Sequence, residues 1–235
     1  MQSIKRLMRR LDLNSNVLEI CTDASLKKFP DGRIFTCSGA VSINSAVERY
    51  TVTSDSTNNR GELLGVYLGV KLAEEELLIN PGKYNVINLY SDSQFAIYGL
   101  RDWMANWLNT LDSNGIIYGS NKKPVKNQEL FMMIITYCVT HNLVINFYNQ
   151  KGHVNTNSSK QLANANRQFY DANGFYLKPE DIFKISFYND IVDKNSRDIL
   201  NQINPDDYPI MDYSNPYNQR MCRYVVPSNF RDYIK

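Results

Sequence analysis

The sequence contains few cysteines, and their spacing fits neither a zinc-binding nor a disulfide-rich module. Cys21, Cys37, Cys138 and Cys222 lie far apart along 235 residues, and no two of them form a CxxC pair. This spacing argues against a zinc site and against a disulfide framework. A reducing compartment is the natural setting for such a chain, so we expect a cytoplasmic protein.

Long apolar runs are also lacking. No stretch approaches the roughly 18–20 apolar residues that a membrane-spanning helix requires, and residues 1–16 lack the apolar centre of a signal peptide. The net charge of +2 is too small to indicate a nucleic-acid partner by itself. Residues 1–16 are basic, and they form either a short leader or an auxiliary contact for phosphate groups through Lys5, Arg6, Arg9 and Arg10.

The hydrophobic periodicity predicts one α/β domain over residues 17–174. Strands are expected at 16–25, 33–43, 46–54, 85–93 and 143–150, and helices at 57–78, 93–108, 128–142 and 160–172. The first three strands follow one another with short connections, which favours an antiparallel meander. Because helices separate the later strands, we expect a five-stranded mixed sheet with helices on its faces.

Residues 175–235 differ in composition from the rest of the chain. They hold five of the eight prolines and seven of the sixteen tyrosines, and helical periodicity is weak there outside residues 196–203. We expect a separate C-terminal extension that is irregular in structure and aromatic enough to pack on another surface. The sequence assigns it no chemistry and no role.

Three acidic residues lie where chemistry is common in such sheets. Asp23 and Asp92 each end an expected strand, and Glu62 lies one turn into the first long helix. Taken singly, each could be a turn or cap residue. If the two strands are neighbours, the three carboxylates converge at one sheet edge. Converging carboxylates repel one another unless a divalent cation neutralises them, and their hard oxygen ligands suit Mg²⁺ and phosphodiester chemistry.

Around these acids, the segments TDAS, TNNRGEL, YSDSQF, KKPVKNQELF and KGHV occur in the order found in type 1 ribonuclease H. The sequence resembles that family from residue 18 to about residue 170. The resemblance implies a ribonuclease H-like fold and hydrolysis of the RNA strand of an RNA–DNA hybrid. It also implies two Mg²⁺ ions per site, with Mn²⁺ as a substitute, held by Asp23, Glu62 and Asp92. His153, in KGHV, would act in proton transfer.

The sequence departs from the family pattern at the fourth metal-binding acid. The family has alanine followed by aspartate at the start of the last helix, whereas this sequence reads LANANRQF, and Asn164 is the best match. A neutral amide oxygen would hold a metal ion more weakly than a carboxylate. Asn164 is either a natural variant or an introduced substitution. Asp171, two helical turns on, would take its place only if the helix were displaced.

The resemblance further implies contacts to both strands of a hybrid. Amide side chains suit the 2′-hydroxyls of RNA because they donate and accept hydrogen bonds. The implied contacts are Asn58, Asn59 and Gln94 for the RNA strand, Thr57, Asn127 and Arg60 for a DNA phosphate, Trp103 and Trp107 for DNA sugars, and Lys122, Lys123 and Lys126 for further phosphates. The two tryptophans, at i and i+4 on a helix, could equally be core residues.

Three functions stay open from the sequence. The first is an active hybrid-specific endoribonuclease, for example one that removes RNA primers in DNA replication. The second is a catalytically weak or inactive hybrid-binding module on the same fold, which Asn164 makes credible. The third is a junction-resolving nuclease of that fold, which Asn58 and Gln94 disfavour. A monomer is expected in each case, in the cytoplasm or, if the source is viral, in that of the host cell.

Overall fold

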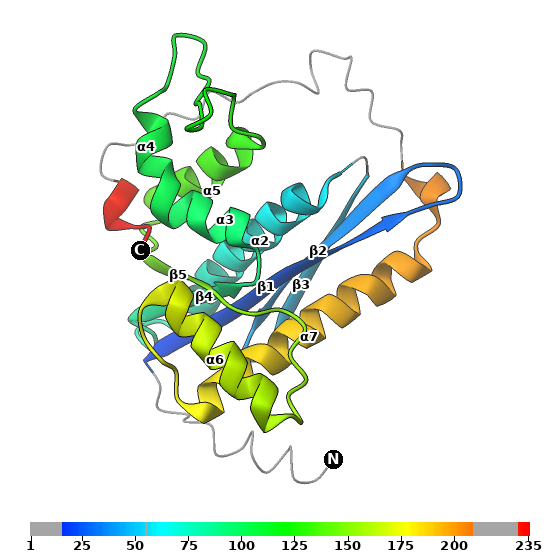
Figure 1. Cartoon of the computed structure of the whole chain (residues 1–235), viewed down its shortest axis with the longest axis vertical. Coiled ribbons are helices and arrows are strands. Elements are labelled where there is room, and N and C mark those ends of the chain that lie inside the picture. Colours follow the sequence, from blue (N-terminus) through cyan, green and yellow to red (C-terminus); the bar gives the residue numbers. More distant parts are fainter. Residues whose placement is uncertain (1–15, 55, 209–229) are drawn as a thin grey trace.

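Figure 1 shows the computed structural model, which describes residues 16–54, 56–208 and 230–235. The basic side chains of the leader, Cys222 and much of the C-terminal extension lie outside these residues. The strands are β1 (Val17–Lys28), β2 (Ile34–Ser42), β3 (Glu48–Ser54), β4 (Val86–Ser91) and β5 (Ile145–Asn149). The α-helices are α2 (Asn58–Ile79), α3 (Gln94–Tyr98), α4 (Met104–Leu108), α5 (Gln128–Thr140), α6 (Ser159–Asn173) and α7 (Pro179–Gln202). None of the described helices is long and apolar enough to cross a membrane.

The five strands form one mixed sheet in the order β3-β2-β1-β4-β5. Strands β1, β2 and β3 are antiparallel, whereas β4 runs parallel to both β1 and β5. The predicted sheet is therefore confirmed, and each strand lies within a few residues of its expected place. The helical crossovers bring β4 beside β1, so the strand that contains Asp23 is the neighbour of the strand that precedes Asp92.

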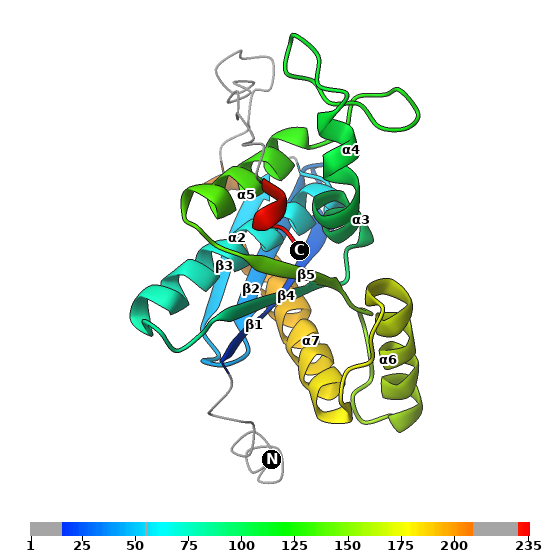
Figure 2. The same ribbon diagram turned by 90° about the vertical axis from the view of Figure 1, so that its left-hand side faces the viewer.

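Helices cover both faces of the sheet (Figures 1 and 2). Helices α2 and α5 lie on one face, and α6 and α7 lie on the other. Side chains of β1 alternate between the two layers: Leu18 and Ile20 belong to the core under α2, and Cys21 belongs to the core under α7. Even-numbered residues of β1 thus face α2, and odd-numbered residues, Asp23 among them, face α7.

The helix expected at 93–108 is divided into three parts. Helix α3 is followed by a π-helical turn, η1 (Gly99–Trp103), and then by α4. A Cβ atom at Gly99 would lie 2.3 Å from the ring of Phe131 on α5, so the backbone approaches α5 closely at this turn.

The expectation of an irregular extension is wrong for residues 179–202, which form the 24-residue helix α7. Pro179 occupies the first turn, where a missing N–H costs nothing. The buried stripe of α7 mixes apolar side chains such as Ile185 and Val192 with polar ones such as Asn189 and Asp193. This mixture dilutes the apolar periodicity on which the sequence-based expectation depended.

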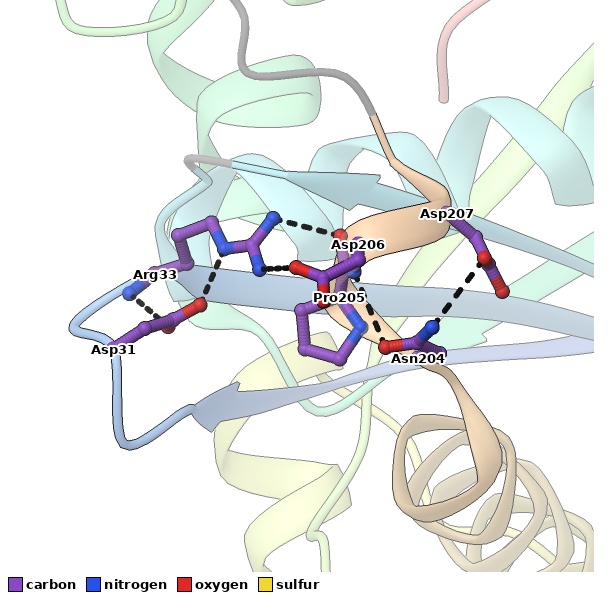
Figure 3. Close-up of polar contacts among 6 residues, drawn as sticks. All are labelled: Asp31, Arg33, Asn204, Pro205, Asp206 and Asp207. Atoms are coloured by element: carbon purple, nitrogen blue, oxygen red, sulfur yellow. Dashed lines mark hydrogen bonds and ion pairs between the residues drawn. The ribbon is translucent and has the colours of Figure 1, made fainter.

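The short 3-10 helix η2 (Pro205–Asp207), which follows α7, is fixed to the turn between β1 and β2 (Figure 3). Arg33 donates to the carbonyl oxygen of Pro205 at 2.7 Å and forms ion pairs with Asp206 at 2.7 Å and Asp31 at 2.6 Å. Since Arg33 bridges two segments far apart in sequence, it helps to set the position of α7 along β1.

Candidate active site

Two carboxylates meet where the parallel pairing of β1 with β4 ends. Asp23 was expected to end the first strand, but β1 continues to Lys28 as the antiparallel partner of β2, so Asp23 lies within the strand. The register places Thr22 opposite Ser91, so the residues that follow, Asp23 and Asp92, are neighbours. The backbone of the loop after β5 passes close to this pair, because a Cβ atom at Gly152 would lie 1.9 Å from Asp92 Oδ2. Only glycine leaves room for the Asp92 carboxylate at this point.

A line of glycines on α2 brings Glu62 to the same place. A Cβ atom at Gly65 would lie 3.1 Å from the carbonyl oxygen of Asp23, and one at Gly69 would lie 2.6 Å from Thr22 Cγ2. The missing side chains let α2 lie directly on β1. Glu62 is 5% exposed, and its Oε2 atom has no hydrogen-bond partner among the described residues.

The three carboxylates form a tight group of hard oxygen ligands. Asp23, Glu62 and Asp92 each offer an oxygen atom, and these atoms lie within 4.8 Å of one another. Burial, followed by the charge of Asp92, raises the pKa of Asp23 to about 8. Burial and the two aspartates also raise the pKa of Glu62, and burial raises that of Asp92. A buried, unpartnered carboxylate oxygen within such a group fits a divalent cation such as Mg²⁺ or Mn²⁺.

The carboxylates line an open, mainly polar cavity of about 480 Å³. Its other lining residues include Asn58, Asn59, Gln94 and His153, all of which the sequence marked as functional. The His153 ring is 74% exposed, and its backbone has a φ of +52°. The structure therefore gathers three of the four predicted metal-binding side chains, together with the predicted proton-transfer and RNA-contacting side chains, around one cavity.

Asn164 does not line this cavity. It lies exposed on α6, whose buried residues are Ala165 and Phe169, and Asp171 is also exposed on that helix. A different acid lines the cavity instead: Asp193, in the middle of α7, which is 6% exposed.

Sequence reasoning missed Asp193 and the groups around it. Ser25 Oγ donates to Asp193 Oδ1 at 3.0 Å, and Asn189 Nδ2 donates to Asp23 Oδ2 at 3.2 Å. Gln150 Nε2 donates to Asn189 Oδ1 at 2.6 Å and fixes that amide. The available signal was a polar stripe at helical spacing, in which Asn189 and Asp193 are four residues apart.

The expected DNA-phosphate contacts lie at the neighbouring ends of α2 and α5. Thr57 caps α2, its hydroxyl accepting a hydrogen bond from Arg60 N at 3.3 Å, and Asn127 precedes α5 with a φ of +57°. Arg60 forms an ion pair with Glu129 of α5. These residues do not line the carboxylate cavity, and the positive charge of Arg60 is already balanced.

The two tryptophans line a second cavity of about 400 Å³ with residues 118–121. Their ring centroids are 5.7 Å apart, and Trp103 is the more exposed. Trp107 also packs edge-to-face on Phe131 at 5.3 Å, so it is part core and part cavity wall. Lys122 and Lys123 are exposed in the turn that follows Asn121 and do not line this cavity.

The chain is similar to known proteins in sequence and in fold. A family model described as RNase H matches residues 15–168, a stretch that ends before α7. A ribonuclease H of Pseudomonas fluorescens is 27% identical over 155 residues, which are 64% of this chain and 91% of that protein. One from Pseudoalteromonas translucida is 35% identical over 98 residues, covering 42% of this chain and 54% of that protein. A structure of the foamy viral protease-reverse transcriptase in complex with RNA/DNA hybrid is 14% identical, with a TM-score of 0.51 over 80% of this chain and 20% of that chain, which shows similarity of fold alone.

Proposed function

Since the chain belongs to the RNase H family, we propose that it is a metal-dependent endonuclease that hydrolyses the RNA strand of RNA–DNA hybrids. The observation that supports this proposal best is the convergence of three carboxylates within 4.8 Å at the point where the parallel pairing of β1 with β4 ends. Such a group is costly to bury without a cation, and its position matches the sheet edge where ligands bind in open α/β folds.

Asp23, Glu62 and Asp92 would hold two Mg²⁺ ions, for which Mn²⁺ would substitute. Bound divalent ions supply an activated water and stabilise negative charge on the phosphate and the leaving oxygen. Two hydrogen bonds fix the Asp23 carboxylate. The Ala24 N–H donates to its Oδ1 at 2.7 Å and Asn189 to its Oδ2, so the carboxylate is held in one orientation.

His153 would carry protons between the cavity and solvent. Its exposed ring lines the cavity, and Nδ1 lies 3.4 Å from Asp193 Oδ2. A carboxylate beside Nδ1 favours a proton on that atom, which leaves Nε2 free to accept one from the reacting groups.

Recognition of RNA would depend on the amides at the rim of the cavity. Asn58, Asn59 and Gln94 are exposed and line it beside the carboxylates, so they are available to 2′-hydroxyl groups. The cavity at Trp103 and Trp107 would receive the DNA strand, with Lys122 and Lys123 supplying charge to its phosphates.

The main reason to consider a catalytically inactive binding module was Asn164 at a metal-ligand position, and Asn164 lies outside the carboxylate cavity. A junction-resolving nuclease remains the second candidate, since it would use the same acids on duplex DNA.

The described cysteines are free and buried, which suits the cytoplasm. We expect a monomer, and removal of RNA primers is the physiological use that we consider first.

The decisive experiment is cleavage of labelled RNA–DNA hybrid, duplex RNA and duplex DNA in Mg²⁺ or Mn²⁺. We expect cuts in the RNA strand of the hybrid alone and none in EDTA. Asp92→Asn should remove this activity, whereas Asp171→Asn, which changes an exposed acid of α6, should leave it intact. Cleavage of duplex DNA at an equal rate would favour the junction-resolving nuclease instead.

A further inference from the structure

Strand β1 and helix α7 are joined by polar contacts in a regular register. Every second residue of β1 faces the helix, and each reaches a residue further along α7. The contacts are Lys184 Nζ with Glu19 Oε2 at 2.6 Å, Cys21 Sγ with the Ile185 carbonyl at 3.6 Å, Asn189 Nδ2 with Asp23 Oδ2 at 3.2 Å and Ser25 Oγ with Asp193 Oδ1 at 3.0 Å. This register places Asn189 beside Asp23 and Asp193 beside Ser25, two residues further along β1, where Asp193 lines the carboxylate cavity.

The surroundings of Asp193 differ from those of a structural ion pair. The carboxylate is buried, yet its two nitrogen-bearing partners are mainly exposed: the Arg197 guanidinium, 2.9 Å away, is 58% exposed, and the His153 ring, 3.4 Å away, is 74% exposed. Both side chains are free to move toward solvent. A buried carboxylate whose partners are so exposed is available to another cation.

A second, independent observation in the same cavity points to a cation. Glu62 Oε2 is buried without a hydrogen-bond partner among the described residues, a state that is costly unless a ligand satisfies the oxygen. Asp193 is not one of the three acids within 4.8 Å of one another. Since it lines the same cavity, it would bind an ion beside that group rather than within it.

Building on the function proposed above, we propose that Asp193 supplies the fourth carboxylate of the metal centre, directly or through a bound water, and that Asn164 takes no part. The ligand thus comes from α7, outside the stretch matched by the family model. Arg197 is the counter-ion with which the cation competes. Asn189 is a positioning residue, since it holds Asp23 from the same face of α7.

The test is a titration of the full chain with Mn²⁺, in which electron paramagnetic resonance counts the free ion. Asp193→Asn should lose one bound ion or weaken binding by about tenfold or more. Its matched control is Asp198→Asn, which removes an exposed carboxylate of the same helix that pairs with Lys194 at 2.6 Å. The control should keep the affinity within about twofold.

Arg197→Gln should act in the opposite direction, because it removes the competing guanidinium. We expect Mn²⁺ to bind about two- to fivefold more tightly than to the control Lys194→Gln, which removes an exposed cation from the same helix. Since this variant gains rather than loses affinity, its result does not depend on whether Asp193→Asn folds. Circular dichroism at 222 nm verifies that each variant keeps its helices.

Asn164→Asp separates the two candidate positions of the fourth acid. We expect unchanged Mn²⁺ affinity, because that side chain lies exposed on α6. Tighter binding by Asn164→Asp, or equal binding by folded Asp193→Asn and the unmodified chain, would overturn the inference. If Mn²⁺ binding follows the expected pattern but no hybrid is cut, the proposed function fails while the assignment of Asp193 stands.

Discussion

Removing one carboxylate from the cluster should stabilise the metal-free protein. Asp92→Asn keeps the shape of the side chain but takes away a buried negative charge that lies within 4.8 Å of the carboxylates of Asp23 and Glu62. In EDTA no divalent cation offsets the repulsion among these carboxylates, so the repulsion destabilises the unmodified fold to its full extent. The variant should therefore unfold at a higher temperature, although it removes a residue of the proposed active site.

The size of the effect follows from the distance between the charges. Two unit charges 4.8 Å apart repel by about 3.5 kcal/mol at an effective dielectric constant of about 20. For a chain of this size, 1 kcal/mol shifts the melting temperature by about 2–4 °C, so full ionisation corresponds to an increase of about 7–14 °C. At lower pH the carboxylate cluster holds a proton and its members repel one another less, so the increase in melting temperature caused by Asp92→Asn should be smaller.

The pH dependence has a defined sign. The folded-state pKa of Asp23 is raised from 3.8 to about 8. A raised pKa means that the folded state binds the proton more tightly than the unfolded state does, so this contribution to stability is complete below about pH 4 and is lost as the pH rises through 8. The advantage of Asp92→Asn over the unmodified chain should therefore grow between pH 5 and pH 9.

The assay is thermal unfolding by circular dichroism in EDTA at several pH values, with Asp171→Asn as the control for one exposed carboxylate of α6. Saturating Mg²⁺ should reverse the order, because the unmodified chain binds it more tightly than the variant does. An Asp92→Asn variant that is less stable than the unmodified chain in EDTA at pH 8–9 would refute the reasoning.

Cleavage, metal binding and hybrid affinity each depend on a different part of the site. Asp23→Asn should abolish cleavage, whereas its affinity for the hybrid, measured by fluorescence anisotropy, should stay within about threefold of that of the unmodified chain, because phosphate contacts lie elsewhere. A fully active variant would show that Asp23 is not a metal ligand. Gly152→Ala should weaken Mn²⁺ binding by about tenfold, since its methyl group would lie 1.9 Å from Asp92 Oδ2; unchanged affinity would contradict this contact. Hybrid affinity should fall steeply with salt as counterions are released, and a flat response would exclude the phosphate contacts.

Three of the acids were predictable because each lies at a point that a local pattern marks. Asp92 follows a run of strand-forming residues, Asp23 interrupts another such run, and Glu62 follows a capping threonine by one helical turn. The adjacency of β1 and β4 follows from a helical crossover between parallel strands. Local sequence and a general rule of chain topology were sufficient for this part of the fold and of the site.

The best sequence match to the fourth acid, Asn164, lies on a helix that does not line the cavity, because chain order is a poor guide beyond β5. Helix α6 buries Ala165 and Phe169. Asn164 precedes Ala165 by one residue, so it lies about 100° around the helix from the buried side. No pattern in the sequence reports the rotation of α6 or the register of α7 on β1, because both depend on packing against distant strands.

The polar stripe of α7 indicates why that register matters. A helix that merely covered the sheet would gain more stability from apolar residues, since each buried polar group costs about 1–3 kcal/mol when it lacks a partner. Asn189 and Asp193 are buried all the same, and each has partners: Asn189 contacts Gln150 and Asp23, and Asp193 contacts Ser25. All of these partners lie at the carboxylate end of the sheet or next to it. Because Asn189 and Asp193 have their hydrogen-bond partners in this register, the contacts that fix the helix also place the Asp193 carboxylate in the cavity.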